Sequence, residues 1–450
     1  MGTEKGSARS LDDRAYKETE ELSAYIGMCT SPYHAVHVSE ARLRAAGFES
    51  LPFDRIGKLR PGNYVMNVYG STLIAVHIGE TPRDSLRIMT GHTDFPALRV
   101  KPNPLMSDTG YYKLNVEAYG GLLLSTWTDR PLAMSGIVAC RSDDPYRPKI
   151  VAVDSRRPIA TIPNLAIHMN RNANEGTVLN RQKDMLPVLG TIPEGEHRIP
   201  DDVWRAFLLS LMPDDVCVLP EDILSYELTL YPAESGAVHA FGNAEEATFS
   251  SHRLDNMTSC LACLKGIEEA KRAEAEGIRI VVLFDNEEVG SRTKQGGASS
   301  VLPAMLRRIY DGLGLSEADL HEDIARGFML SADAGHALHP NHPEKNDVTN
   351  VPRLNGGVLL KIAASQSYAG DAVSIAAVTD LCLRNDIPHQ VYVNRSDIPG
   401  GSTLGPIVSS VVPMRTMDVG VPILAMHSAR ETGGVRDQSA LNRLAEVFLG

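Results

Sequence analysis

Two stretches of the chain alternate short apolar runs with amphipathic segments, and they cover residues 1–98 and 238–450. Apolar residues three and four positions apart predict helices over 15–29, 34–47, 259–277, 301–314, 374–386 and 440–449. Apolar runs of four to seven residues, such as 278–284 and 327–332, predict buried strands between the helices. This alternation predicts an α/β fold with a mostly parallel sheet that is flanked by helices.

Residues 99–237, between these two stretches, have a different pattern. Strand-like segments at 110–120, 121–129 and 133–139 alternate with connections that are rich in Pro and Arg, and helical periodicity is scarce. The sequence therefore predicts one discontinuous α/β domain, formed by 1–98 and 238–450, and a β-rich domain inserted at 99–237.

Composition and charge exclude several classes of protein. Hydrophobic residues make up 43% of the chain and charged residues 22%, which is typical of a soluble globular protein and argues against disorder. The formal net charge of -12 argues against a nucleic-acid-binding protein, which needs a clustered basic surface. No apolar run approaches the roughly 18 residues of a transmembrane helix, and no apolar signal-peptide core follows Met1. We therefore expect a cytoplasmic protein with no membrane partner.

The six cysteines are scattered, which is typical of proteins in a reducing compartment. Cys260 and Cys263 have the C-x-x-C spacing of a redox pair. They lie in a stretch of helical periodicity, so the sequence favours two buried helix residues over a redox pair.

Clusters of acidic and imidazole side chains are the candidates for chemistry. They are GHTD with His92 and Asp94, SHRLDN with Asp255, FDNEEVGS with Asp285, Glu287 and Glu288, SADAGHALHPNH with Asp333, and AMHSARET with His427 and Glu431. Four of the clusters directly follow predicted strands, and SHRLDN opens a predicted helix. Ligands of open α/β sheets collect outside the carboxyl ends of the strands, so we expect these clusters to share one crevice.

The residue types in these clusters predict metal binding. His92 and Asp94 face the same side of a strand, so His92 can bind a metal while Asp94 orients its ring. Glu287 and Glu288 are adjacent and diverge, so one can bind metal while the other serves as a base. Two His and three carboxylates are too many ligands for one tetrahedral catalytic zinc and fit two metals, with zinc the default and manganese or cobalt the alternatives.

Taken in chain order, these segments resemble the aspartyl aminopeptidase family of dinuclear zinc metallopeptidases. Further matching motifs are EAYGGLLLSTWTDR, IPNLAIHMNRNANEG and GSTLGPI, and the resemblance extends over nearly the whole chain. It implies a zinc-exopeptidase-like domain with an inserted dimerisation domain. It also implies a homo-oligomer in which dimers assemble into a tetrahedral dodecamer.

The resemblance implies a ligand set for two zinc ions per subunit. His92, Asp255 and Asp333 would hold one ion. Asp255, Glu288 and His427 would hold the other, with Asp255 as the bridging carboxylate.

The resemblance also implies the catalytic residues of a peptidase that acts on peptide N-termini. Glu287 would take a proton from a water bridging the two metals and return it to the leaving amine. Asp94 would support His92. His168, in IPNLAIHMNRN, would reach the active site of a neighbouring subunit and assist there in binding the substrate and stabilising the oxyanion.

Specificity and alternative functions stay open at this point. Lys361 and Tyr368 match positions associated with the substrate pocket, and a Lys there could select Asp or Glu by charge pairing. Phe95 and Ser367 depart from the family pattern, so the alternatives are a neutral-residue aminopeptidase or a related zinc deacylase. A catalytically silent, self-assembling shell protein is the alternative outside the enzymes, although such a protein would not need to keep Glu287 and every proposed ligand.

The spacing H-x-x-H-x-x-H of His336, His339 and His342 could indicate a separate zinc site. Pro340 and Pro343 interrupt any helix there, so the spacing does not place the three rings on one face. We therefore do not expect a second metal centre at this segment.

Overall fold

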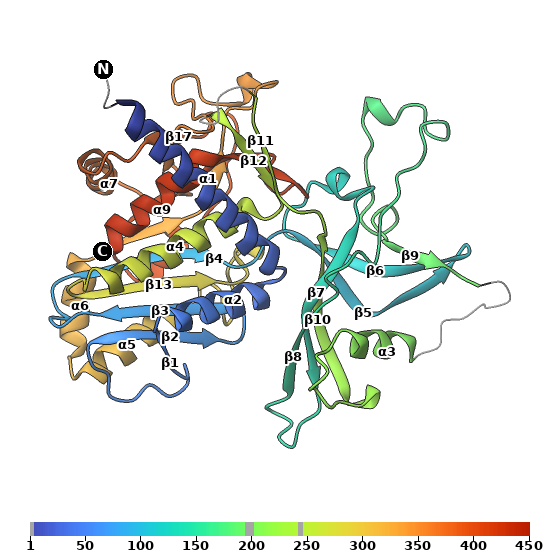
Figure 1. The fold of residues 1–450 in the computed structure, drawn as a ribbon, viewed down its shortest axis with the longest axis horizontal. Helices are drawn as coiled ribbons and strands as arrows, with labels where there is room; N and C mark the ends of the chain where they lie inside the picture. The colour runs from blue at the N-terminus through green and yellow to red at the C-terminus, as the bar shows by residue number, and fades with distance from the viewer. Residues whose placement is uncertain (1–3, 194–201, 242–245) are drawn as a thin grey trace. The chain divides into compact units, whose positions relative to one another are not determined.

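The computed structural model describes residues 4–193, 202–241 and 246–450, with only the backbone for residues 4–13. The chain forms two compact units (Figure 1). The first comprises Met1–Asp94, Gly236–Met426 and Glu431–Gly450, and the second comprises Phe95–Ser235 and His427–Arg430. The domain boundaries proposed from the sequence stay a prediction. The predicted boundaries assign the short segment His427–Arg430 to the α/β domain. The compact units instead group this segment with Phe95–Ser235.

A nine-stranded sheet forms the centre of the first unit, with the order β1-β2-β3-β13-β4-β14-β18-β16-β17. Its strands are β1 (Glu49–Ser50), β2 (Gly62–Val68), β3 (Thr72–Ile78), β4 (Leu86–His92), β13 (Ile278–Phe284), β14 (Phe328–Ala332), β16 (Val358–Ile362), β17 (His389–Val393) and β18 (Arg415–Gly420). The central strands β13, β4, β14 and β18 are parallel to their neighbours in this group. Antiparallel pairs join β2 to β3, β3 to β13, and β16 to β18. The mostly parallel α/β fold predicted from the sequence is confirmed.

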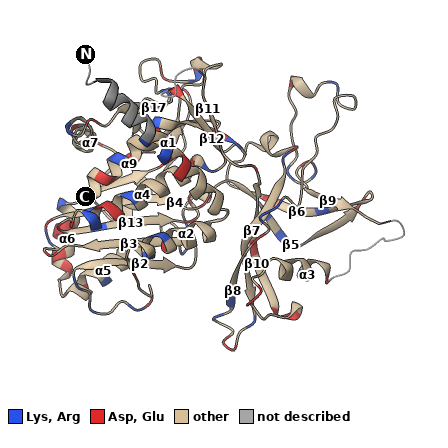
Figure 2. Cartoon of the chain, in the orientation of Figure 1, with Lys and Arg blue, Asp and Glu red and all other residues tan. Residues whose placement is uncertain are grey.

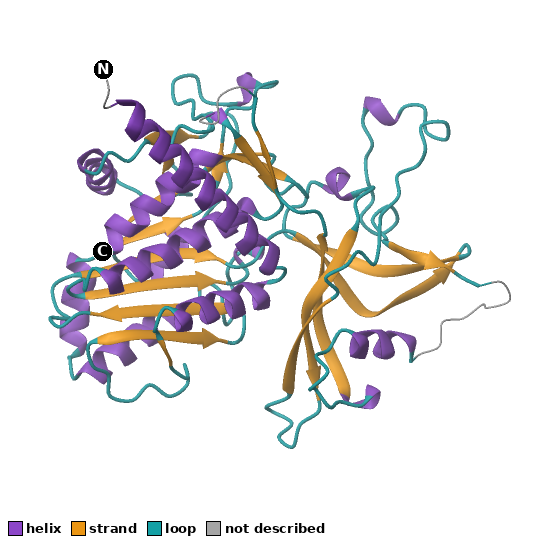
Figure 3. Cartoon of the chain, in the orientation of Figure 1, coloured by secondary structure: helices purple, strands orange, loops and turns teal. Residues whose placement is uncertain are grey.

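Helices cover both faces of this sheet (Figure 3). They are α1 (Glu4–Met28), α2 (Pro32–Ala45), α4 (Leu254–Arg272), α5 (Val301–Leu313), α6 (Glu317–Arg326), α7 (Ala372–Arg384), α8 (Leu404–Val411) and α9 (Val435–Leu449). Alternate residues of β13, from Ile278 to Phe284, pack in one core cluster with α5, α6 and α8. Helices α4 and α9 contact each other, and both contact β4. Cys260 and Cys263 are fully buried on α4, as predicted for structural helix residues.

A smaller five-stranded sheet also belongs to the first unit, with the order β11-β12-β20-β19-β15. Its strands are β11 (Ala237–His239), β12 (Thr248–Ser251), β15 (Gly335–His336), β19 (Pro422–Leu424) and β20 (Glu431–Gly434). Strand β15 begins two residues after Asp333, and β12 ends four residues before Asp255. This small sheet therefore fixes the chain just before Asp255 and just after Asp333.

The second unit is built on a six-stranded antiparallel sheet with the order β8-β7-β10-β5-β6-β9. Its elements are β5 (Ala97–Asp108), β6 (Tyr111–Tyr119), β7 (Leu132–Cys140), β8 (Lys149–Asp154), β9 (Val188–Thr191), α3 (Val203–Ser210) and β10 (Ile223–Pro232). Basic and acidic residues are interspersed along both units (Figure 2).

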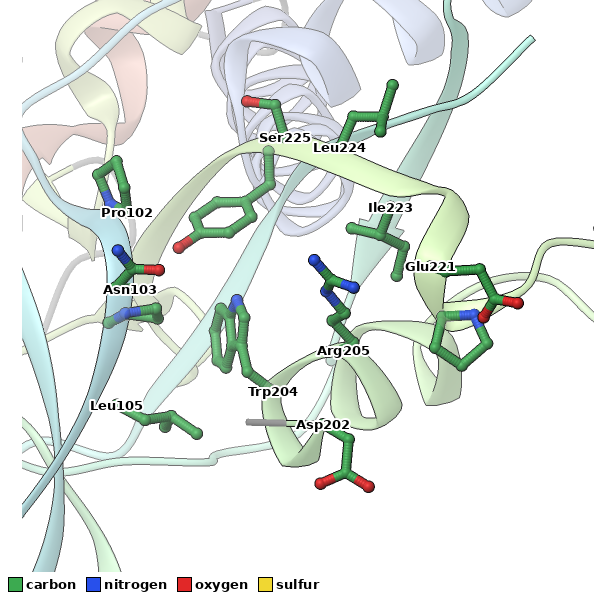
Figure 4. Close-up of a pocket in the computed structure, with 13 residues that line it drawn as sticks. Pro102, Asn103, Leu105, Asp202, Trp204, Arg205, Glu221, Ile223, Leu224 and Ser225 are labelled. Carbon is green, nitrogen blue, oxygen red and sulfur yellow. The ribbon is translucent and has the colours of Figure 1, made fainter. Parts of the chain in front are cut away.

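A cavity of about 650 Å³ opens between β5 and β10 in the second unit (Figure 4). The two strands pair only at Thr229–Arg99 and Leu230–Leu98. Beyond these pairs, α3 covers the gap, and the Trp204 ring lies 5.7 Å from the ring of Tyr226. The cavity therefore lies where β5 and β10 separate beyond their two paired positions.

The prediction of a strand at residues 121–129 is wrong. The structure has a 3-10 turn at Leu124–Trp127 instead. The hydroxyls of Thr126 and Thr128 donate to the carbonyls of Leu123 and Ser125, both at 2.7 Å. Such local bonds compete with the pairing of a strand.

No described helix is long and apolar enough to cross a membrane.

Candidate metal centre

The carboxyl ends of three neighbouring strands bring acidic and imidazole side chains together. Strand β4 ends at His92, Asp285 follows β13, and Asp333 follows β14. Because β4 is parallel to both β13 and β14, these ends lie at the same edge of the sheet. Helix α4 contributes Asp255 from its first turn. The residues that the sequence places at the ends of β4, β13 and β14 thus lie at one edge of the nine-stranded sheet.

His92 lies at the centre of a buried cluster. Its Nε2 atom is 3.3 Å from Asp255 Oδ1 and 3.5 Å from Asp333 Oδ1. One ligand atom from each of the three residues lies within 4.8 Å of the others. The side chains of His92, Asp255 and Asp333 are all buried. This arrangement gives one nitrogen and two oxygen donors around a common point, which suits a divalent transition metal.

A backbone oxygen, that of Asp94, fixes the orientation of the His92 ring. Its Nδ1 atom lies 3.0 Å from the backbone oxygen of Asp94 and 3.4 Å from Asp94 Oδ1. We assign the ring proton to Nδ1 because a carbonyl oxygen can only accept. In the neutral form of His92 the lone pair is then on Nε2, the atom that faces the two carboxylates, which is the tautomer that a metal ligand needs.

The Asp94 side chain has a second set of partners. Its Oδ1 accepts the backbone N–H of Glu287 at 3.0 Å, and its Oδ2 accepts that of Glu288 at 3.1 Å. These two amides open the short 3-10 turn Glu287–Val289. Asp94 is completely buried. It therefore holds the turn that carries the acidic pair, in addition to contacting His92, and its supporting role in catalysis stays a prediction.

Both glutamates of this turn face the same cluster, because ligand atoms of His92, Glu287 and Glu288 also lie within 4.8 Å of one another. Burial raises the pKa of Glu287 to about 8, and the nearby carboxylates of Asp333 and Asp94 add to the rise while His92 opposes it. Burial, followed by the charge of Asp255, raises the pKa of Glu288 well above its usual range.

The cluster has more negative than positive groups. Burial alone would lower the pKa of His92, but hydrogen bonds to Asp255, Asp333 and Asp94 raise it well above its ordinary value. Buried carboxylates that are this close together require a compensating positive charge. A proton on His92 supplies one such charge, and a divalent cation supplies two. The donor set therefore fits the zinc expected from the sequence.

Two predicted site residues belong to the second unit. His427 has a φ of 65°, and its Nδ1 lies 3.1 Å from the backbone oxygen of Gly121. His168 is exposed in the connection between β8 and β9. The roles of both residues stay predictions.

Lys361 and Tyr368, which match substrate-pocket positions, are 2% and 4% exposed. The ammonium of Lys361 lies 2.8 Å from the backbone oxygen of Ala334 and 3.3 Å from Asp333 Oδ2. It also lies 4.9 Å from the centre of the Tyr368 ring. The side chain of Lys361 is thus directed at a candidate metal ligand.

Two further residues support the cluster, and only Cys260 was not a candidate from the sequence. Glu431 accepts the backbone N–H of Asp255 at 3.1 Å, and Cys260 donates its thiol to the backbone oxygen of His92 at 2.9 Å. Glu431 was a candidate from the sequence, in the same AMHSARET cluster as His427, but no role was assigned to it. Cys260 gave no signal beyond its place on a buried helix.

The three histidines of the H-x-x-H-x-x-H segment line a cavity of about 500 Å³ in the first unit, together with Tyr392 and Asn394. His336, His339 and His342 are exposed. Within the described ranges, the only sets of three possible metal ligands in reach of one another involve His92 or Asp255.

Comparisons with known proteins give one consistent family. The model of the aminopeptidase I zinc metalloprotease family (M18) matches residues 25–448. A probable M18 family aminopeptidase 2 from Clostridium novyi (strain NT) is 41% identical over 425 residues, which cover 94% of this chain and 96% of the relative.

Solved structures show the same fold. A chain from the cryo-EM structure of the Ape4 and Nbr1 complex matches with a TM-score of 0.91 at 31% identity, covering 100% of this chain and 87% of that one. The mApe1 dodecamer of S. cerevisiae matches with a TM-score of 0.80, covering 98% and 97% of the two chains. At 24% identity, this second match shows the fold alone.

Proposed function

This chain belongs to the M18 family of zinc metallo-aminopeptidases, and we propose that it removes N-terminal residues from peptides with two zinc ions and Glu287 as the general base. The observation that carries the proposal is the buried cluster of His92, Asp255 and Asp333 beside the acidic pair at Glu287 and Glu288. Hydrolysis of a peptide bond needs an activated water and a proton carrier, and this cluster offers ligands for the first and a carboxylate for the second.

His92, Asp255 and Asp333 would hold the first ion, and Asp255, Glu288 and His427 the second. Asp255 would be shared, which places the two ions close together. The assignment is supported by the mutual reach of His92, Asp255 and Asp333 and by the contact of His92 Nδ1 with a backbone oxygen, which directs Nε2 toward the two carboxylates. Manganese or cobalt would suit the same nitrogen and oxygen donors.

When bound, the two ions would lower the pKa of a water between them and polarise the carbonyl of the first peptide bond. Glu287 would accept the proton of that water and then donate it to the leaving amine. Its pKa of about 8 in the metal-free cluster is close to neutral, as suits a group that must accept and release a proton. His168 of a neighbouring subunit would donate to the developing oxyanion. The free α-amino group of the substrate would bind near the second ion and acidic side chains, which restricts cleavage to N-termini.

Replacement Glu287→Gln tests the role of the base. It keeps the size of the side chain and removes its ability to take up a proton, so turnover should fall by roughly 100-fold or more. Zinc content, measured by elemental analysis, should stay at the wild-type level. Glu317→Gln, an exposed change at the start of α6, is the matched control and should leave both quantities unchanged. Near-normal turnover of zinc-loaded Glu287→Gln would refute the assignment.

The preferred N-terminal residue is a separate part of the proposal. An acidic preference would require a cation exposed to the first side chain, and a neutral preference would follow if no such cation is available. Comparing hydrolysis of Asp-, Glu-, Leu- and Lys-terminal amides, with and without a chelator, distinguishes the two. A flat or Leu-favouring profile would exclude the acidic preference.

We also propose a homo-oligomer in which the second unit makes the dimer contacts and six dimers form a tetrahedral dodecamer. The likeness of this fold to that of the S. cerevisiae mApe1 chain, which was solved as a dodecamer, supports this proposal. A mass measurement of the intact particle tests it, and a stable monomer would overturn it.

A further inference from the structure

We infer that Asp418 is a positioning residue for the substrate pocket, because its carboxylate fastens two loops of the first unit to each other. The inference rests on the proposed function. Asp418 is completely buried on β18, which lies between β14 and β16 in the nine-stranded sheet. The first loop, residues 363–371, joins β16 to α7 and carries Tyr368. The second loop, residues 394–403, joins β17 to α8.

One carboxylate oxygen of Asp418 binds both loops. Its Oδ2 accepts the backbone N–H of Ala369 in the first loop and, at 2.9 Å, the hydroxyl of Thr403 in the second. The backbone N–H of Asp418 donates to the carbonyl of Ala369 at 2.9 Å, and the backbone N–H of Thr403 donates to the carbonyl of Ser367 at 3.3 Å. The two loops are therefore bonded to one buried carboxylate and also to each other.

The start of α8 is adapted to this carboxylate. A Cβ atom at Gly405 would overlap Asp418 Oδ2, so a residue without a side chain leaves the space that the carboxylate fills. Thr403 occupies the N-cap position of α8, where a hydroxyl usually accepts a backbone N–H of the first turn. Among the described residues, the Thr403 hydroxyl makes no such bond to its helix and donates to Asp418 instead. The second loop is thus fixed to the sheet at the point where the helix begins.

Both loops border the candidate site. Tyr368 in the first loop matches a substrate-pocket position, and residues 398–401 of the second loop line the cavity of about 500 Å³. The same cavity is lined by His336, which lies three residues after Asp333. The bonds of Asp418 described above end on the loops and not on a candidate metal ligand. Loosening them should therefore weaken the binding of a peptide more than the binding of zinc.

Thr403→Val tests this inference, because Val has nearly the shape of Thr and lacks the hydroxyl that Asp418 accepts. The variant leaves the charge of Asp418 in place, so the neighbouring Lys361 keeps its electrostatic environment. We expect KM for N-terminal amides to rise by about 10-fold, as for the loss of a hydrogen bond to a charged acceptor. The values of kcat and zinc affinity should stay close to those of the wild type. Thr403→Ser, which restores a hydroxyl, should recover most of the wild-type KM.

Thr416→Val is the matched control. Thr416 is also buried on β18, and its hydroxyl donates to the carbonyl of Met414 at 2.9 Å, away from both loops. This change should lower the melting temperature and leave KM unaltered. If Thr403→Val likewise lowered the melting temperature and kept the wild-type KM, the inference would be overturned, because the bond to Asp418 would serve stability alone.

Hydrogen–deuterium exchange gives a second measurement that needs no turnover. In Thr403→Val the backbone amides of residues 363–371 and 394–403 should exchange faster, whereas those of β14 should keep their protection. Unchanged exchange in both loops would overturn the inference. Faster exchange in both loops would support the connection through Asp418 even if the wild-type enzyme proved inactive on N-terminal amides, an outcome that would refute the proposed function instead.

Asp418→Asn is the second variant, and it is judged by the same KM and exchange outcomes if Thr403→Val does not fold. When both variants fold, they complete a double-mutant cycle. Because each removes the bond between Thr403 and the carboxylate, the double variant should raise KM no further than the larger of the two single changes. Two effects that multiply in full would show that the residues act independently, which would overturn the inference.

Discussion

The replacement Asp94→Asn separates two ways in which Asp94 can support the site. In the structure, the carboxylate accepts the N–H groups of Glu287 and Glu288, whereas the nearest partner of His92 Nδ1 is the backbone oxygen of residue 94. The replacement leaves that backbone oxygen in place, so the tautomer of His92 should persist. It removes one of the two acceptors for the turn and places an N–H₂ group against a backbone N–H.

The size of the effect follows from this geometry. A hydrogen bond to a charged acceptor is worth about 1.5–3 kcal/mol, and each 1.4 kcal/mol corresponds to about tenfold in rate. If the lost bond holds Glu287 in its working position, kcat should fall by about 10- to 150-fold. Zinc affinity should fall by less than about tenfold, because the ring of His92 keeps its orientation.

The assay combines steady-state kinetics at saturating zinc with a chelator competition. Thr93→Val is the matched control, because Thr93 is buried between His92 and Asp94 but donates to the backbone oxygens of Ser71 and Phe284. It should lower the melting temperature and leave kcat of the zinc-saturated enzyme intact. The reasoning would be refuted if Asp94→Asn lost zinc affinity by about 100-fold while keeping kcat, since Asp94 would then act through His92.

Two further predictions concern protonation and thiol chemistry. Burial raises the pKa of Glu287 to about 8 in the metal-free cluster, above the roughly 4.3 of an unfolded chain, so the folded state holds the extra proton between these values. The free energy of unfolding of the metal-stripped protein should therefore fall as pH rises from about 5 to 8. Urea titrations should show a smaller fall for Glu287→Gln. An equal dependence of the unfolding free energy on pH in both proteins would contradict this prediction. Cys260 and Cys263 are buried, and burial raises the pKa of both thiols, so a thiol reagent should label exposed Cys217 and spare this pair until the protein unfolds. Labelling of Cys260 in the native enzyme would restore the redox interpretation.

The parts of the fold with strong local patterns could be predicted from the sequence. Buried parallel strands read as continuous apolar runs, so β13 and β14 were found together with the acidic residues that follow them. Helices α6 and α8 were missed, because α6 is a short, polar segment and α8 follows a Gly-rich loop that obscures its start. The error at residues 121–129 came from hydroxyl groups that bond within the turn, which apolar patterning does not reveal.

The place of a candidate site residue could be predicted where the residue lies at the end of a buried strand. His92 and Asp333 meet this condition, and their roles stay predictions. The direction of Lys361 does not, because it depends on a strand inserted between β14 and β16 and on Gly420, where a Cβ atom would overlap the backbone oxygen of Asp333. The backbone bond that fixes His92 was equally invisible, since a sequence shows which side chains are present and not which carbonyl lies beside a ring.

The borders between the two compact units have a practical consequence for chimeric enzymes. Asp94 is the last residue before the chain leaves the first unit, and His427 is the first residue of the short segment that is grouped with the second unit. Exchanging the second unit between relatives at these borders would place one seam directly beside Asp94 and another directly beside His427. A seam moved into β5, a few residues beyond Ala97, would keep Asp94 and its neighbours with one parent. Leaving His427–Arg430 with the parent of the first unit would remove the seam beside His427.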